Sequence, residues 1–128
     1  MSPQLAQRVL ELGQEMIDLR TLGEARMLYE LLVPLSSDDH AREALFGLGR
    51  SYELSGEPVR AAGYYLRSAL LVQAVAPDAL AFQARLLAAL NLMRAGLKND
   101  ARSQFEWLLR NSKDAALIEA ARRGMERL

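Results

Sequence analysis

The residues whose types could support catalysis or metal binding are His40 and the neighbouring Asp38 and Asp39. His40 is the only histidine, and one histidine beside two carboxylates is a combination that can hold a metal ion. With no cysteine and no second histidine, the usual zinc sites and cysteine–histidine nucleophiles cannot be assembled. Serines and aspartates at 36–39 are also typical of a helix start, which is our interpretation of them. The sequence therefore predicts no enzyme, no metal site and no cofactor.

Two other features invite a ligand interpretation. Gly47-Leu48-Gly49 resembles part of a phosphate loop, but such loops follow a β-strand, and β-branched residues are too scattered here to form one. Trp107 is the only tryptophan, and we expect it to pack against the last helix rather than to cage a ligand.

Composition bounds the fold class and the partners. The 128 residues suffice for one domain, and the apolar residues are mostly leucine and alanine, which favour helix. We expect an all-α fold. Sixteen basic and sixteen acidic residues leave no net charge, which argues against nucleic acid as a partner. The start lacks the pattern of a signal peptide and no apolar run could span a bilayer, so we expect no membrane insertion and a cytoplasmic location.

The elements that would position any site are seven helices joined by short turns. Apolar residues recur at helical spacing, and Gly, Pro, Ser, Asp and Asn mark the boundaries. Thr21 and Glu24 predict a capping box, and Asn99 and Ser112 are expected to cap the last two helices. The predicted helices cover about residues 3–19, 22–34, 40–54, 58–75, 78–95, 100–110 and 113–127.

The sequence repeats itself along these helices. Pairs 36 positions apart are Val9 and Leu45, Leu12-Gly13 and Leu48-Gly49, Met16 and Tyr52, Ala25 and Ala61, and Tyr29 and Tyr65. Pairs 40 positions apart are Tyr52 and Leu92, Gly56 and Gly96, Ala61 and Ala101, and Tyr65 and Phe105. Three helix hairpins therefore repeat, and the last helix lies outside them.

On these residues the chain resembles the tetratricopeptide repeat (TPR) family, whose signature is a large residue, then Leu-Gly, then a tyrosine, then an alanine and an aromatic on the second helix. The third unit departs from it, with Ala88-Ala89 in place of Leu-Gly. The resemblance implies a right-handed superhelix of three hairpins and a C-terminal capping helix in one domain, residues 1–128. The units would span about 3–35, 39–75 and 78–111, and the capping helix about 113–127.

The spacing between the second and third units exceeds the roughly 34 residues of a regular repeat. We expect the extra residues to extend the two helices that flank Pro77. A break in the stacking at Pro77 is the alternative.

The resemblance also implies where a partner would bind, because the first helix of each TPR hairpin lines a concave groove. Counting around these helices from the packed Leu-Gly face predicts the lining, with Gln7 also facing inward. The predicted groove residues are Leu10, Gln14, Ile17, Glu43, Phe46, Arg50, Glu53, Leu54, Gln83, Leu86, Leu90, Met93 and Arg94.

Two functions fit such a mixed apolar and charged groove. The first is a protein-binding module or small chaperone that holds an extended or helical segment of a partner protein. Size, unit count and the layout of the middle unit are similar to the bacterial type III secretion chaperones of the TPR class. The second is a structural scaffold in which apolar surface mediates self-association, including a homodimer.

Overall fold

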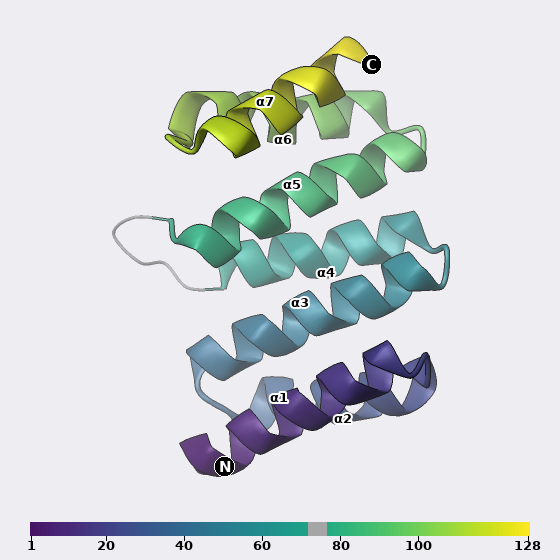
Figure 1. The fold of residues 1–128 in the computed structure, drawn as a ribbon, viewed down its shortest axis with the longest axis vertical. Helices are drawn as coiled ribbons and strands as arrows, with labels where there is room; N and C mark the ends of the chain where they lie inside the picture. The colour runs from purple at the N-terminus through teal and green to yellow at the C-terminus, as the bar shows by residue number, and fades with distance from the viewer. Residues whose placement is uncertain (72–76) are drawn as a thin grey trace.

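A computed structural model describes residues 1–71 and 77–128, and these residues form seven α-helices and no strand (Figure 1). The expectation of an all-α chain is confirmed. The fourth helix ends at Leu70, and its predicted continuation to Val75 falls on residues outside those described. The helices are α1 (Pro3–Asp18), α2 (Leu22–Leu35), α3 (Asp38–Leu54), α4 (Pro58–Leu70), α5 (Ala79–Arg94), α6 (Lys98–Asn111) and α7 (Ala115–Glu126).

Local chemistry explains where several helices begin. Ser2 accepts a hydrogen bond from the Leu5 amide at 3.1 Å, with Pro3 in the first turn, where no donor is needed. Asp78 caps α5 by accepting from the Ala81 amide at 3.0 Å. Gly56 and Gly96 have positive φ angles of 72° and 79°, which lets the chain turn at the ends of α3 and α5.

Three predicted caps were wrong. The Thr21 hydroxyl donates back to the Met16 carbonyl and accepts no amide of α2, so no capping box forms. The sixth helix begins at Lys98, one residue before the predicted cap Asn99. Asp114 rather than Ser112 caps α7, accepting from the Ala116 amide at 2.8 Å. The three side chains make other hydrogen bonds instead: Thr21 and Ser112 bond to backbone groups, and Asn99 Oδ1 accepts from the Arg102 guanidinium.

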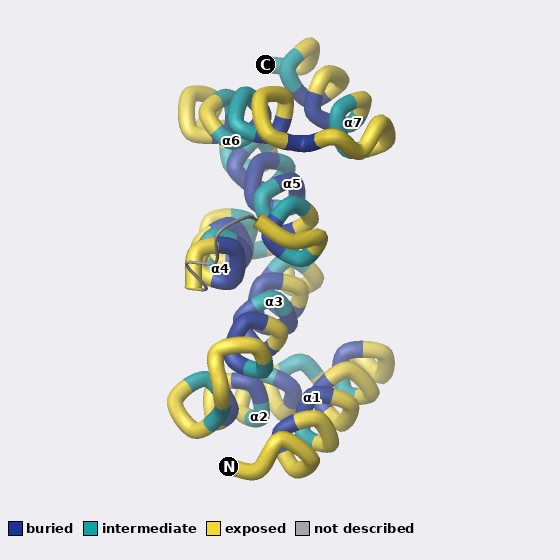
Figure 2. The backbone as a smooth tube through the Cα atoms, turned by 90° about the vertical axis from the view of Figure 1, so that its left-hand side faces the viewer, coloured by how far each residue is buried: buried dark blue, intermediate teal, exposed yellow. Residues whose placement is uncertain are grey.

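The helices form two layers. Consecutive helices pack against each other, and α1 also contacts α3 while α5 contacts α7. The odd-numbered helices make one layer and α2, α4 and α6 the other (Figures 1 and 2). In Figure 2, α1 and α7 lie on the same side of α3 and α5, so the odd layer is an arc. Since α5 packs directly on α4, the stacking is not broken at Pro77.

The core is built on aromatic rings that lie against glycines. A Cβ added at Gly13 would lie 2.7 Å from the Tyr29 ring, and a Cβ added at Gly47 would lie 2.5 Å from the same ring. The Tyr65 ring meets Gly49 in the same way, at 2.8 Å. The repeat aligned Tyr29 with Tyr65, so equivalent rings fill equivalent spaces between helices that only glycine leaves open.

A buried arginine joins three helices. Arg42 of α3 donates to both carboxylate oxygens of Asp78, at 2.7 and 2.5 Å, and so is tied to the N-terminus of α5. The Ser68 hydroxyl of α4 donates to the Arg42 carbonyl at 2.8 Å. Burial makes this bidentate pair sensitive to loss of Asp78, because the Arg42 side chain is only 8% exposed and its guanidinium would stay desolvated.

Trp107 does not take the place predicted for it. Its ring lies 5.4 Å from that of Phe82 and the Arg85 guanidinium lies 3.9 Å from its centre, and both of these residues belong to α5. Trp107 therefore packs on the preceding helix. The ring that meets α7 is Phe105, which lies against Gly124.

Candidate functional site

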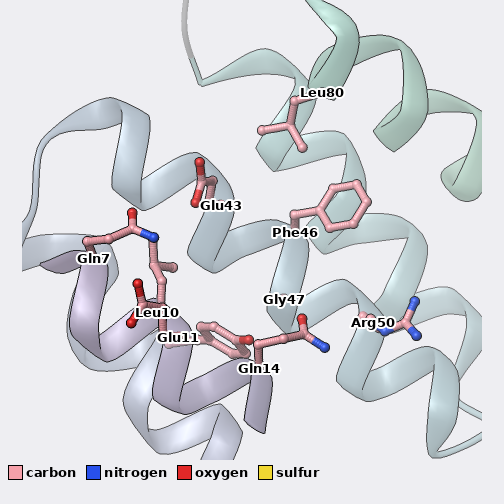
Figure 3. Close-up of a pocket in the computed structure, with 10 residues that line it drawn as sticks. Gln7, Leu10, Glu11, Gln14, Glu43, Phe46, Gly47, Arg50 and Leu80 are labelled. Carbon is pink, nitrogen blue, oxygen red and sulfur yellow. The ribbon is translucent and has the colours of Figure 1, made fainter. Parts of the chain in front are cut away.

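A pocket of about 380 Å³ opens on the odd layer between α1 and α3 (Figure 3). We call it the α1–α3 pocket. Four helices contribute to it, with α5 reaching in through the start of its first turn. Its lining consists of Gln7, Leu10, Glu11 and Gln14 from α1, Tyr29 from α2, Glu43, Phe46, Gly47 and Arg50 from α3, and Leu80 from α5.

The lining follows the repeat. The α1 residues stand at positions 7, 10, 11 and 14, spacing that places them on one helix face. The α3 residues stand at 43, 46, 47 and 50, each 36 positions later, the offset that relates the first two units. Two equivalent helix faces therefore line one pocket because α1 packs beside α3.

Tyr29 forms the floor of the pocket. Its ring is held between the backbones of α1 and α3 at Gly13 and Gly47. Burial, and to a smaller extent the nearby Asp18 carboxylate, raise the pKa of Tyr29 to about 12, while the Arg50 charge acts in the opposite direction. The hydroxyl therefore stays protonated near neutral pH.

The charges around the rim are separated. Glu11 and Glu43 lie at one side of the pocket and Arg50 at the other, with the Phe46 ring and Leu80 between them (Figure 3). Glu43 and Arg50 are exposed, whereas Phe46 is half-buried and meets the Tyr65 ring edge-on at 5.1 Å. An apolar centre with an acidic and a basic end suits a ligand that is itself mixed in character.

Six residues predicted to face the groove come together here: Gln7, Leu10, Gln14, Glu43, Phe46 and Arg50. Ile17 does not, and its prediction as a groove residue was wrong. Its side chain is 0% exposed and packs in the core formed by the first three helices. Helix counting placed it one turn beyond Gln14, but α1 turns that position toward α2 and α3.

Sequence reasoning missed four lining residues. Glu11 could have been predicted to line the groove, because it lies four positions after Gln7 on the same helix face. Gly47 entered the sequence analysis only through its likeness to a phosphate loop, although it directly follows Phe46. Tyr29 and Leu80 had no local signal, since α2 and α5 come to the pocket through tertiary packing.

Glu53 and Arg94 form a salt bridge between the C-terminal ends of α3 and α5. The Arg94 guanidinium lies 3.4 Å from Glu53 Oε1, and the Asn91 side-chain amide donates to the same oxygen at 2.6 Å. Leu54 is exposed beside them and lines neither the α1–α3 pocket nor the second pocket below. These residues join two helices rather than line the pocket.

The remaining predicted residues lie farther along α5. Gln83 and Leu86 line a second pocket of about 560 Å³, the α5–α7 pocket, together with Phe82 and Leu117. Leu90 and Met93 are half-buried against the core and line neither pocket. The predicted residues are therefore divided between two pockets and the surface between them.

His40 lies apart from both pockets. Its Nδ1 is 3.1 Å from the Ser37 hydroxyl at the start of α3. Within residues 1–71 and 77–128, no three His, Cys, Asp or Glu side chains are placed to hold a metal ion. Over the same residues, no helix has the length and apolar character to cross a bilayer.

Comparison with known proteins adds no relative. No protein-family model matches the chain, and no curated protein matches its sequence significantly.

Proposed function

We propose that this chain is a non-enzymatic, TPR-like protein-binding module, and that a segment of a partner protein binds in the α1–α3 pocket. The observation that carries the proposal is the lining itself. The same four positions of two successive units line one open pocket that has an apolar centre and separated charges. Repeat proteins bind partners on such surfaces, which neighbouring units build together.

The charges suggest the chemistry of the segment. Glu43 and Arg50 are seven residues apart on α3, which is about 10 Å along a helix. An extended chain covers about 10 Å in three residues. We therefore expect a basic residue, an apolar residue and an acidic residue within about four positions, with the apolar side chain against Phe46 and the basic one beside Glu11 and Glu43.

The superhelix and the role of a small chaperone belong to this proposal and rest on the repeat. Chaperoning of secretion subunits and a cytoplasmic location stay predictions. A structural scaffold that acts through self-association is the alternative function predicted from the sequence; self-association through a separate surface is compatible with partner binding.

Peptides selected from a random displayed library on the immobilised protein test the proposal. Enriched peptides should carry the basic–apolar–acidic order, and synthetic copies should bind with a fluorescence-polarisation isotherm. Glu43→Arg and Arg50→Glu should each weaken binding at least tenfold, because both side chains are exposed and each meets one end of the segment. Phe46→Glu should abolish binding.

The matched control is Leu109→Glu, which places a charge at an exposed leucine of α6. Circular dichroism should show unchanged helical content for the two charge variants and the control. Binding that survives both Glu43→Arg and Arg50→Glu would contradict the proposed site, whatever Phe46→Glu does to the fold.

A further inference from the structure

The outer face of α1 carries a stripe of three exposed leucines. Leu5, Leu12 and Leu19 are 53%, 42% and 75% exposed and stand seven residues apart. Residues at this spacing lie along one side of a helix, as in a coiled-coil seam. The helix that carries these leucines, α1, lies at the N-terminal end of the stack (Figure 2). We call the row of three leucines the leucine stripe.

The repeat shows that two of the three stripe positions, those of Leu5 and Leu12, are covered in the other units. The residues equivalent to Leu5 and Leu12 in the second unit are Ala41 and Leu48, and both are buried. Their equivalents in the third unit, Ala81 and Ala88, are buried as well. In both units the second helix of the preceding hairpin packs there, α2 on α3 and α4 on α5. The leucine stripe is thus a packing surface, and no described helix packs on it.

We propose that a second copy of this chain covers the leucine stripe, with the two α1 helices antiparallel and a two-fold axis at Leu12. In this register Leu5 of one copy lies level with Leu19 of the other, and the two Leu12 side chains meet. The stripe is then complementary to itself, as an isologous interface requires.

The charges beside the stripe select this arrangement. Arg8 lies four residues before Leu12 and Glu15 three residues after it, on the same edge of the stripe. About the proposed axis, Arg8 of one copy comes within about 1.5 Å, along the helix, of the level of Glu15 of the other. A parallel pair would instead bring Arg8 level with Arg8. Both residues are exposed. Arg8 also lies 3.1 Å from Glu11 of its own helix, an exposed pair that the Glu15 carboxylate of the second copy would extend.

Head-to-tail stacking is the other way two copies could cover the stripe. It would require the outer side of α7, where Glu119, Arg122 and Arg123 are exposed and paired with each other. A charged surface would be desolvated against leucines, which is unfavourable. Charge therefore favours a closed dimer over a filament.

The proposal is independent of the partner-binding function. The α1–α3 pocket uses Gln7, Leu10, Glu11 and Gln14, which face a different side of α1 from Leu12. Because Glu11 pairs with Arg8, the variant that separates the two proposals is Leu12→Glu. This variant should break the dimer and leave peptide binding unchanged, so the failure of either proposal can be recognised by itself.

Sedimentation equilibrium over a hundredfold dilution tests the dimer. The wild-type chain should give a monomer–dimer equilibrium, and Leu12→Glu should raise its dissociation constant at least tenfold. Leu109→Glu, the same change at an exposed leucine of α6, should leave the constant unchanged. Leu12 is partly exposed, and circular dichroism should show that the variant keeps its helical content.

Charge reversal tests the register. Arg8→Glu alone and Glu15→Arg alone should each weaken the dimer, and the double variant should restore it, because only a cross-copy pair is re-formed by both changes. Mass at the monomer value throughout, a dimer that survives Leu12→Glu, or oligomers that keep growing with concentration would overturn the dimer. A dimer that the double variant does not restore would overturn the antiparallel register.

Discussion

Replacing Gly47 by alanine tests how closely the pocket floor is packed. The new Cβ would lie 2.5 Å from the Tyr29 ring, well inside van der Waals contact. The ring has little room to withdraw, because it also lies against Gly13 of α1, where an added Cβ would be 2.7 Å from it. Overpacking of a tight site costs about 3 kcal/mol, and alanine recovers about 1 kcal/mol of helix propensity. We expect a net loss of about 2 kcal/mol.

The matched control is Gly63→Ala on α4, where an added Cβ would have no neighbour within 4 Å. It should gain about 1 kcal/mol from helix propensity alone. Urea unfolding followed by circular dichroism measures both variants. In a Tyr29→Ala background, Gly47→Ala should lose its penalty, giving a coupling energy of about 3 kcal/mol. If Gly47→Ala stabilised the wild-type chain as Gly63→Ala does, the packing of Tyr29 between α1 and α3 would be refuted.

Two further predictions concern stability. The hydrogen bonds from Arg42 lower the pKa of Asp78 from 3.8 to about 2. The stability that the ionised Asp78 contributes to the fold is therefore complete above about pH 4 and is lost as pH falls through about 2. Such a shift equals about 2 kcal/mol, reduced to about 1 kcal/mol because the Asp78 side chain is 52% exposed. Asp78→Asn should lower the free energy of unfolding at pH 7 and flatten its fall between pH 4 and 2. An unchanged fall of the free energy of unfolding over this pH range would contradict this. Ala61→Leu should destabilise by about 3 kcal/mol, since Ala61 is fully buried on α4, and a neutral result in urea unfolding would contradict the packing of α4.

The number of helices and most of their limits could be predicted, because they depend on local signals. Apolar periodicity, Pro58 in a first turn and the glycines at 56 and 96 each act within a few residues. The failed caps at Thr21 and Asn99 show the limit of that reasoning. Several backbone partners are within reach of a polar side chain, and the sequence does not say which one it takes.

The candidate site was predictable only where helix geometry suffices. The α1 and α3 faces follow from counting along a helix, so Leu10, Phe46 and Arg50 were placed correctly by spacing. Ile17 failed because its helix face depends on how α1 is turned against its neighbours. Glu53 and Arg94 carry unlike charges, but only the approach of α5 to α3 shows that they meet.

The sequence by itself determined that this chain is helical and repeated, and which residues of successive units are equivalent. Those properties follow from backbone preference and from the period of apolar residues, both local quantities. The tertiary structure decided what the equivalent positions do. Equivalent faces of α1 and α3 line the same pocket. By contrast, Leu12 of α1 is exposed, whereas the equivalent Leu48 of α3 is buried. The physical reason is that burial depends on which helix packs against a residue, and α1 has no preceding hairpin among the residues described.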